Sequence, residues 1–270
     1  MQALSKPLLK YCASQISRRA FLGGAISASG CIACDRLARS QSLSNYGASG
    51  GCWLEPDEAT PLMEGQEIIA YASGNEEIVP KSGIAGFDRA LANSLARLTH
   101  AFDVLPGFGY YDEKPGENNA YATPAVRLER ADGTVLFGTR MLQDLLQRHE
   151  SPDAAVLAVC AHEYGHIVQY KYNLRDRLLA NQNTVRKLEL NADYFAGYFA
   201  GVRKLENSNF PAAVFANTQH SFGDFNTGSK GHHGTPNERA AAVVLGFVAA
   251  HDKRLTFQQA IEDGLAQVGA

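Results

Sequence analysis

The spacing of apolar residues predicts three helices between residues 87 and 204. From Phe87 to Phe102, apolar side chains recur every three or four positions, which is the repeat of a helix that packs one face inward. Residues 156–170 are apolar nearly all round, which predicts a buried, central helix. A further apolar stripe, from about Thr184 to Lys204, predicts a second long helix.

Three short segments between the first two helices have the composition of strands: 108–111, 120–123 and 134–138. Turn residues rich in Gly, Pro and Asp separate them, so we expect a small, mainly antiparallel sheet. A short helix follows over about 139–148. Together these elements place the chain in the α+β class.

Helix-start signals refine the predicted boundaries. Ser151 and Pro152 precede the buried helix as a predicted N-cap and first helical residue. Thr235 and Glu238 have the spacing of a capping box, so a helix should begin there. Thr256 is placed to cap a final helix that ends near residue 268.

The N-terminus has the character of an export signal. No acidic residue precedes Asp35, and a basic segment is followed by an apolar run at 20–33 that is short and rich in Gly and Ser. Residues 17–22, Ser-Arg-Arg-Ala-Phe-Leu, resemble a twin-arginine signal, which implies export of the folded protein by the twin-arginine machinery. A disordered basic N-terminus or an uncleaved anchor is the alternative.

Two cleavage sites are compatible with this signal. Residues 28–31 resemble a lipoprotein box, which would leave a lipid on Cys31 as the only membrane contact, whereas 31–33 offer an ordinary signal-peptidase site. We divide the chain into a signal at 1–34, a linker at 35–75 and a globular domain at 76–270. Cleavage after residue 33 removes four of 25 basic and none of 28 acidic residues, so 21 against 28 leaves a net charge of −7. This balance argues against nucleic acid as a partner.

The buried helix carries the pattern H-E-x-x-H. His162 and His166 are four residues apart, so one helix face can present two imidazoles to one metal ion, with Glu163 beside them. Catalytic zinc takes three protein ligands. Glu189, on the next long helix, is the best third candidate, and Asp193, one turn further, is placed to accept the spare N–H of a liganding histidine.

H-E-x-x-H followed by E-x-x-x-D on the next helix resembles the gluzincin metallopeptidases. The form Glu-x-x-Ala-Asp-x-x-Ala-Gly, from Glu189 to Gly197, is similar to the HtpX-like and CAAX-prenyl-protease family and to the neutral zinc metallopeptidases of bacteria. Residues 118–122 resemble the Asn-Ala-x-Ala segment of these enzymes. The Pro-Gly-Gly sequence and the membrane helices of the HtpX-like enzymes are missing here, which leaves the subfamily open. The resemblance implies a zincin-like fold.

The resemblance also implies a reaction. Zinc held by the two histidines and Glu189 would activate water and polarise a peptide carbonyl, with Glu163 as general base. The segment 134–138, with Val135, Leu136 and Phe137, resembles the edge strand that binds an extended substrate. The expected function is a zinc metalloendopeptidase for exported or envelope proteins, located in the periplasm or envelope. The alternative is a catalytically weak, metal-binding scaffold or chaperone-like envelope protein, which would not need Glu163.

A downstream loop offers further candidates. His233 and Arg239 resemble a His-x-x-Pro-x-x-Arg element in relatives. His233 is our candidate donor to the oxyanion, although His232 and His233 in a Gly-rich loop are equally compatible with a solvated segment. Arg239 would orient the site or form a salt bridge with Asp193 or Glu238.

Several other reactive residues have structural interpretations. Cys52 and Cys160 permit a disulfide but do not argue for one, and Cys160 fits a small core residue. Tyr164 and Tyr194 are in reach of a substrate but are more typical of core aromatics. The remaining histidines are expected to be exposed or to cap helix ends: His100, His149, His220 and His251.

Overall fold

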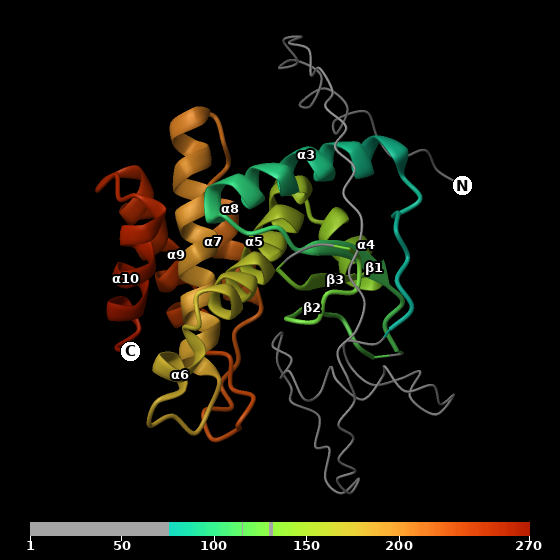
Figure 1. Ribbon diagram of the computed structural model, residues 1–270. Coiled ribbons are helices and arrows are strands. Elements are labelled where there is room, and N and C mark those ends of the chain that lie inside the picture. Colours follow the sequence, from blue (N-terminus) through green and yellow to red (C-terminus); the bar gives the residue numbers. More distant parts are fainter. Residues whose placement is uncertain (1–75, 115, 130–131) are drawn as a thin grey trace, which may run out of the picture. The chain divides into compact units, whose positions relative to one another are not determined.

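The computed structural model describes residues 76–114, 116–129 and 132–270, which all belong to one of the chain's two structural units, residues 49–270 (Figure 1). The predicted signal, its cleavage sites, the linker and Cys52 lie outside the described residues. Within residues 76–270, no described helix combines the length and apolarity needed to cross a bilayer.

The described residues contain eight helices and three strands, which confirms the predicted α+β class. In chain order they are α3 (Ala85–Phe102), β1 (Gly107–Tyr111), β2 (Ala120–Thr123), β3 (Thr134–Gly138), α4 (Thr139–Leu146), α5 (Pro152–Lys171), α6 (Arg175–Leu179), α7 (Arg186–Glu206), α8 (Ala213–Ser221), α9 (Pro236–His251) and α10 (Phe257–Gln267).

Two of the eight described helices, α6 and α8, were not predicted from the sequence. The predicted helix over 184–204 is α7, shifted by two residues at each end. The helix α6 has five residues and buries only Leu178. The helix α8 buries Thr218 and Gln219 beside Phe215, so its core face is partly polar. Neither segment has the periodicity from which a helix is predicted.

The predicted helix starts are confirmed at α9 and α10. Thr235 and Glu238 bond reciprocally as a capping box, and Thr256 forms the same motif with Gln259. The prediction for Ser151 is wrong in one respect. Ser151 does occupy the position before α5, but it has a left-handed backbone with φ 39°, and its side chain accepts no capping hydrogen bond.

The sheet is mixed, so the prediction of a mainly antiparallel sheet is wrong. Its order is β1-β3-β2, with β3 parallel to β1 and antiparallel to β2. All five residues of β3 are buried, as expected of a strand with neighbours on both sides. The assignment of Val135, Leu136 and Phe137 to a substrate-binding edge strand is therefore also wrong. Among the described residues, β2 is the end strand on that side.

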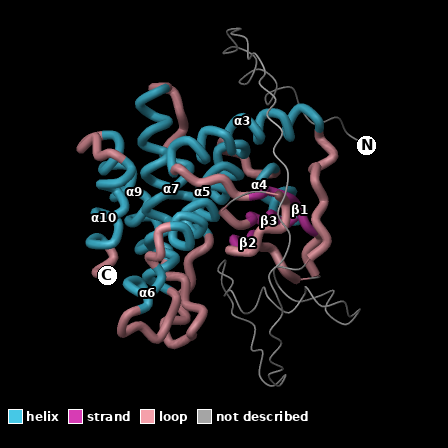
Figure 2. The backbone as a smooth tube through the Cα atoms, in the orientation of Figure 1, coloured by secondary structure: helices cyan, strands magenta, loops and turns pink. Residues whose placement is uncertain are grey.

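The helix α5 is central to the described fold. It contacts α7 and α8 and also β2 and β3, and residues 154–169 are all buried. In Figure 2, α5 runs between α7 and the strands. This confirms the buried helix that the sequence predicts. Cys160 belongs to this core, where burial raises the pKa of its thiol well above the ordinary value.

Glycines allow α5, α7 and α9 to approach closely. A Cβ on Gly165 of α5 would lie 2.9 Å from Ala192 Cα of α7. A Cβ on Gly197 or Gly246 would overlap the backbone across the α7–α9 contact. Side chains larger than hydrogen would separate the helix axes at these points. The close approach brings polar side chains of all three helices within hydrogen-bonding distance.

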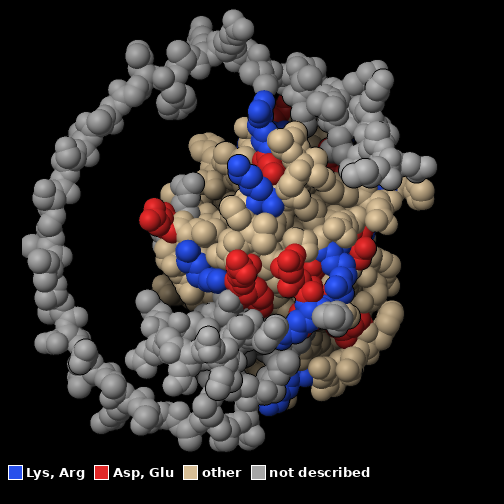
Figure 3. Space-filling model, turned by 90° about the vertical axis from the view of Figure 1, so that its right-hand side faces the viewer, with Lys and Arg blue, Asp and Glu red and all other residues tan. Residues whose placement is uncertain are grey.

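Ion pairs on the surface contribute little to this fold. Acidic and basic side chains of the described residues lie beside one another on the face drawn in Figure 3. The pair Arg97–Glu206 is about half exposed, and so is Arg177–Glu262. Exposed pairs of this kind stabilise a fold by at most about 1 kcal/mol. The buried apolar cluster around α5 and α7 is the main source of stability.

Candidate metal centre

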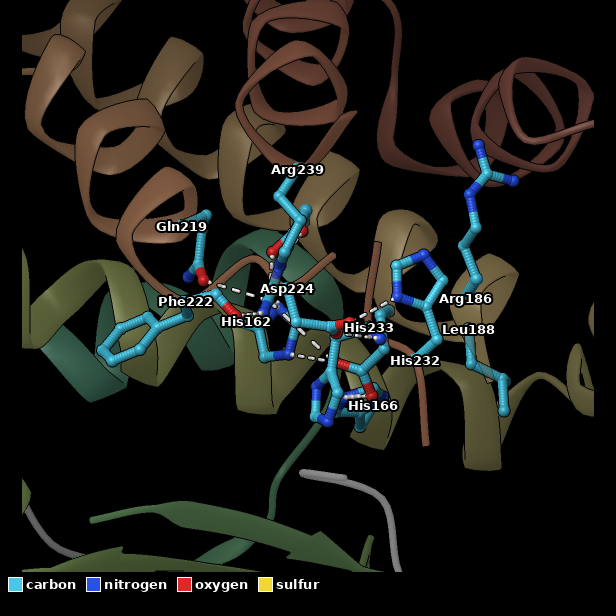
Figure 4. A network of polar contacts seen from close by, with 12 residues as sticks. His162, His166, Arg186, Leu188, Gln219, Phe222, Asp224, His232, His233 and Arg239 are labelled. Atoms are coloured by element: carbon cyan, nitrogen blue, oxygen red, sulfur yellow. Dashed lines mark hydrogen bonds and ion pairs between the residues drawn. The ribbon is translucent and has the colours of Figure 1, made fainter. Parts of the chain in front are cut away.

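Three buried side chains on two helices form a ligand cluster: His162 and His166 of α5, and Glu189 of α7. His162 Nε2 lies 3.4 Å from Glu189 Oε2, and His166 Nε2 lies 3.6 Å from Glu189 Oε1. Figure 4 shows the two rings converging from α5. Ligands about 2.1 Å from a tetrahedral zinc ion are about 3.4 Å apart. Both distances are close to this spacing, so the three side chains could hold a metal ion.

The protonation states of the ligand cluster suit a metal ion. Burial alone would raise the pKa of Glu189, but the neighbouring rings, foremost His233, hold it well below its usual value. Burial lowers the pKa of His166 to about 4, against the opposing effect of Glu189. The ligand cluster thus contains a carboxylate and a neutral imidazole, the forms that bind metals.

His162 is held from behind by a buried ion pair. Its Nδ1 lies 2.7 Å from Asp193 Oδ1, as predicted for Asp193. Arg239 Nε and Nη2 donate to the two carboxylate oxygens of Asp193 at 2.7 and 2.9 Å. Burial raises the pKa of Asp193, but Arg239 and His162 lower it below its usual value. Because the carboxylate can only accept, His162 carries its proton on Nδ1 and directs the Nε2 lone pair toward Glu189.

Arg239 is fixed by two further acceptors. Its Nη2 donates to Gln219 Oε1 at 3.1 Å, and its Nη1 donates to the Phe222 carbonyl at 3.4 Å. Of the roles considered for Arg239, the salt bridge to Asp193 is confirmed, whereas the one to Glu238 is wrong. Glu238 pairs with Arg186 at 2.5 Å instead. Gln219 also donates to Ala158 O and so joins α8 to α5.

His166 is held by a neutral amide that the sequence interpretation overlooked. Gln169 Oε1 lies 2.9 Å from His166 Nδ1. Gln169 Nε2 donates to Leu188 O at 2.8 Å and to Asn191 Oδ1 at 3.0 Å, both on α7. The spacing of three residues between His166 and Gln169 was a visible sign that the two side chains share a helix face.

A cavity of about 320 Å³ opens beside the ligand cluster. Glu163, His162 and His233 contribute to its polar wall. The segment 118–120, which leads into β2, forms another part of the lining. An apolar part consists of Met141, Val159 and Phe222. Glu163 is buried next to the ligand cluster, as the H-E-x-x-H pattern predicts.

The loop between α8 and α9 brings one of its two histidines to the site. Asp224 accepts from the His233 backbone N–H at 2.9 Å and contacts His232 Nδ1 at 2.7 Å. His232 is thereby buried in the loop. The ring of His233 turns the other way, with its Nδ1 3.2 Å from Glu189 Oε2. His233 thus belongs to the candidate site, and Asp224 is a second residue that the sequence interpretation missed.

The other histidines and the two tyrosines agree with their structural interpretations. Tyr164 and Tyr194 are buried in the core, and Tyr194 donates to Asp263. Three of the remaining histidines are exposed and the fourth, His251, is half-buried at the end of α9: His100, His149, His220 and His251.

No protein-family model matches the chain, and no curated protein or solved structure matches it either. The zincin-like fold and the gluzincin resemblance therefore stay predictions, supported by the motifs and by the geometry of the ligand cluster.

Proposed function

We propose that the chain is a zinc-dependent endopeptidase of the gluzincin type. The observation that carries the proposal is the ligand cluster, with two Nε2 atoms at 3.4 and 3.6 Å from the oxygens of Glu189, beside a cavity that Glu163 also lines. A closed structural zinc site would take four protein ligands, whereas catalytic sites use three. Among the residues that the structure describes, the ligand cluster has three.

Glu163 acts as the general base in this proposal. A zinc ion held by the ligand cluster would supply a Lewis acid and lower the pKa of a nearby water molecule. Glu163 accepts a proton from the attacking water and passes it to the leaving amine. A buried carboxylate in this position strengthens proton transfer because bulk water does not compete for it.

The substrate in this proposal is an extended polypeptide. Ala120, the first residue of the end strand β2, lines the cavity together with Asn118, Asn119 and Glu163. A peptide that pairs with the start of β2 would therefore lie beside the cavity wall to which Glu163 contributes. Main-chain pairing with a strand selects extended chains with little regard to side chains. The proposed substrate strand is thus β2, one strand away from the segment 134–138 that resembles such an edge strand.

His233 is the proposed donor to the oxyanion. It lines the cavity, and its Nδ1 contacts the ionised Glu189, so Nδ1 donates there. Stabilising an oxyanion then requires a proton on Nε2 as well. Removing one such donor typically lowers kcat by about 10²–10³-fold.

The cellular location in this proposal follows from the sequence of residues 17–22, which resembles a twin-arginine signal. Substrates would then be exported or envelope proteins. A lipid on Cys31 would attach the protein to the membrane.

Glu163→Gln tests the proposal. Casein hydrolysis by the full chain should be abolished by a chelator and fall by about 10²–10⁴-fold in the variant, with zinc content unchanged. Proteolysis that survives the substitution would rule out this mechanism. Client binding without turnover in both forms would favour the scaffold alternative.

A further inference from the structure

Gln169 links the ligand cluster to α7 through three hydrogen bonds. It is fully buried, one turn after His166 on α5. Its Oε1 contacts His166 Nδ1, and its Nε2 contacts Leu188 O and Asn191 Oδ1. Leu188 and Asn191 flank Glu189, the third ligand, in the sequence of α7.

The orientation of the Gln169 amide follows from its partners. The carbonyl oxygen of Leu188 can only accept, so the Gln169 atom at 2.8 Å from it must be the amide nitrogen. Oε1 therefore faces His166 and can only accept. A neutral His166 ring must then carry its proton on Nδ1, which directs the Nε2 lone pair toward Glu189.

The orientation of the Gln169 amide leaves one buried donor of Asn191 unsatisfied. The Asn191 side chain is fully buried, and its Nδ2 has no hydrogen-bond partner among the described residues. Leaving a buried donor without an acceptor destabilises the folded state. Turning the Asn191 amide would place its nitrogen against Gln169 Nε2, donor against donor. The observed arrangement instead satisfies both N–H groups of Gln169.

We propose that Gln169 is a positioning residue that fixes the Nδ1–H tautomer of His166 and so prepares Nε2 for the metal ion. The inference rests on the proposed metal site and deepens it. Gln169 accepts a hydrogen bond from Nδ1 of His166 as Asp193 does from Nδ1 of His162, but the Gln169 side chain is neutral. An unsupported imidazole in water favours the other tautomer, so loss of Gln169 should turn the His166 lone pair away from the ligand cluster.

The tautomer is measured directly by long-range ¹H–¹⁵N NMR on the zinc-free full chain with labelled histidine, at a pH where the rings are neutral. Wild-type His166 should show a protonated Nδ1 and an unprotonated Nε2. In Gln169→Met the two nitrogens should move toward averaged or reversed signals. Zinc affinity should fall by about 10–100-fold, the usual effect of losing a partner behind a liganding histidine.

Two further variants separate positioning from general loss of packing. In its protonated form, Gln169→Glu keeps an oxygen that accepts from His166 and an O–H that donates to Leu188 O, so it should restore the Nδ1–H tautomer and part of the zinc affinity. Gln219→Met removes a different buried glutamine, which contacts Arg239 and Ala158 rather than His166. It should leave the His166 signals unchanged.

An Nε2–H tautomer in wild-type protein would overturn the inference even if no variant folded. Unchanged His166 signals and zinc affinity in Gln169→Met would overturn it as well. Failure of the wild type to bind zinc would instead contradict the proposed function, because the tautomer is measured without metal.

Discussion

His162 and His166 lie one turn apart on α5, but the groups behind them differ in charge. Behind His162 is the buried ion pair of Asp193 and Arg239. Behind His166 is the neutral amide of Gln169. A carboxylate increases the basicity of the imidazole in front of it more than an amide does. We therefore expect His162 to be the stronger ligand and His166 the one more easily displaced.

Gln169, behind His166, and the Asp193–Arg239 pair, behind His162, also differ in the number of helices that they join. Gln169 belongs to the same helix as the histidine that it holds, and its amide nitrogen donates to two residues of α7. The support of His162 combines α7 and α9 with Gln219 of α8. It therefore depends on the close α7–α9 approach at Gly197 and Gly246. A substitution among Asp193, Arg239 and Gln219 should therefore destabilise the packing of α7, α8 and α9 against one another.

The largest expected effect is on stability, from Arg239→Met. Methionine fills much of the space but leaves the fully buried Asp193 without its cation. Breaking a buried pair in this way typically costs about 3–5 kcal/mol. Urea denaturation of the zinc-free chain should show this loss, and Arg239→Met with Asp193→Leu should recover part of it. A loss below about 1 kcal/mol in the single variant would mean that the pair does not stabilise the fold.

The next effect, on zinc affinity, comes from Asp193→Asn. The substitution keeps the shape of the group behind His162 and removes its charge, so the zinc dissociation constant should rise by about 10–100-fold. The rise should exceed that of Gln169→Met, as measured by competition with a chromogenic chelator. An equal or smaller rise would show that charge does not distinguish the two supports.

Only some of the residues around the two histidines could be predicted from the sequence. Glu189 and Asp193 were accessible because one-turn spacing on a helix fixes which side chains share a face. Gln219 and Asp224 were not, because their partners are distant in the chain and meet only after α8 and the following loop have packed. The position of β3 was missed for a similar reason. Local pattern identifies a strand but carries no information on its neighbours in the sheet.

The partly exposed ion pair Arg186–Glu238 should contribute less to stability than the buried pair Asp193–Arg239. The hydrogen bond from Arg186 lowers the pKa of Glu238 to about 2, although burial opposes this. Because the folded pKa is lower than the unfolded one, the stabilisation is present above about pH 4.5 and is lost as the pH falls toward 2.

Glu238→Gln keeps a residue that can form the capping box and removes the charge. Both side chains are 36% exposed, so the variant should lose only about 0.5 kcal/mol at pH 7. The difference from wild type should shrink between pH 5 and pH 3 in urea denaturation series. A difference that grows on acidification would contradict the assigned sign.

The central claim is that His162, His166 and Glu189 hold a zinc ion, and calorimetric zinc titration of the zinc-free full chain tests it most directly. Two matched variants complete the measurement, Glu189→Gln in the ligand cluster and Glu163→Gln beside it. The wild type and Glu163→Gln should each bind about one zinc ion per chain, whereas Glu189→Gln should lose most of the affinity. Absence of binding in the wild type, or unchanged affinity in Glu189→Gln, would contradict the claim.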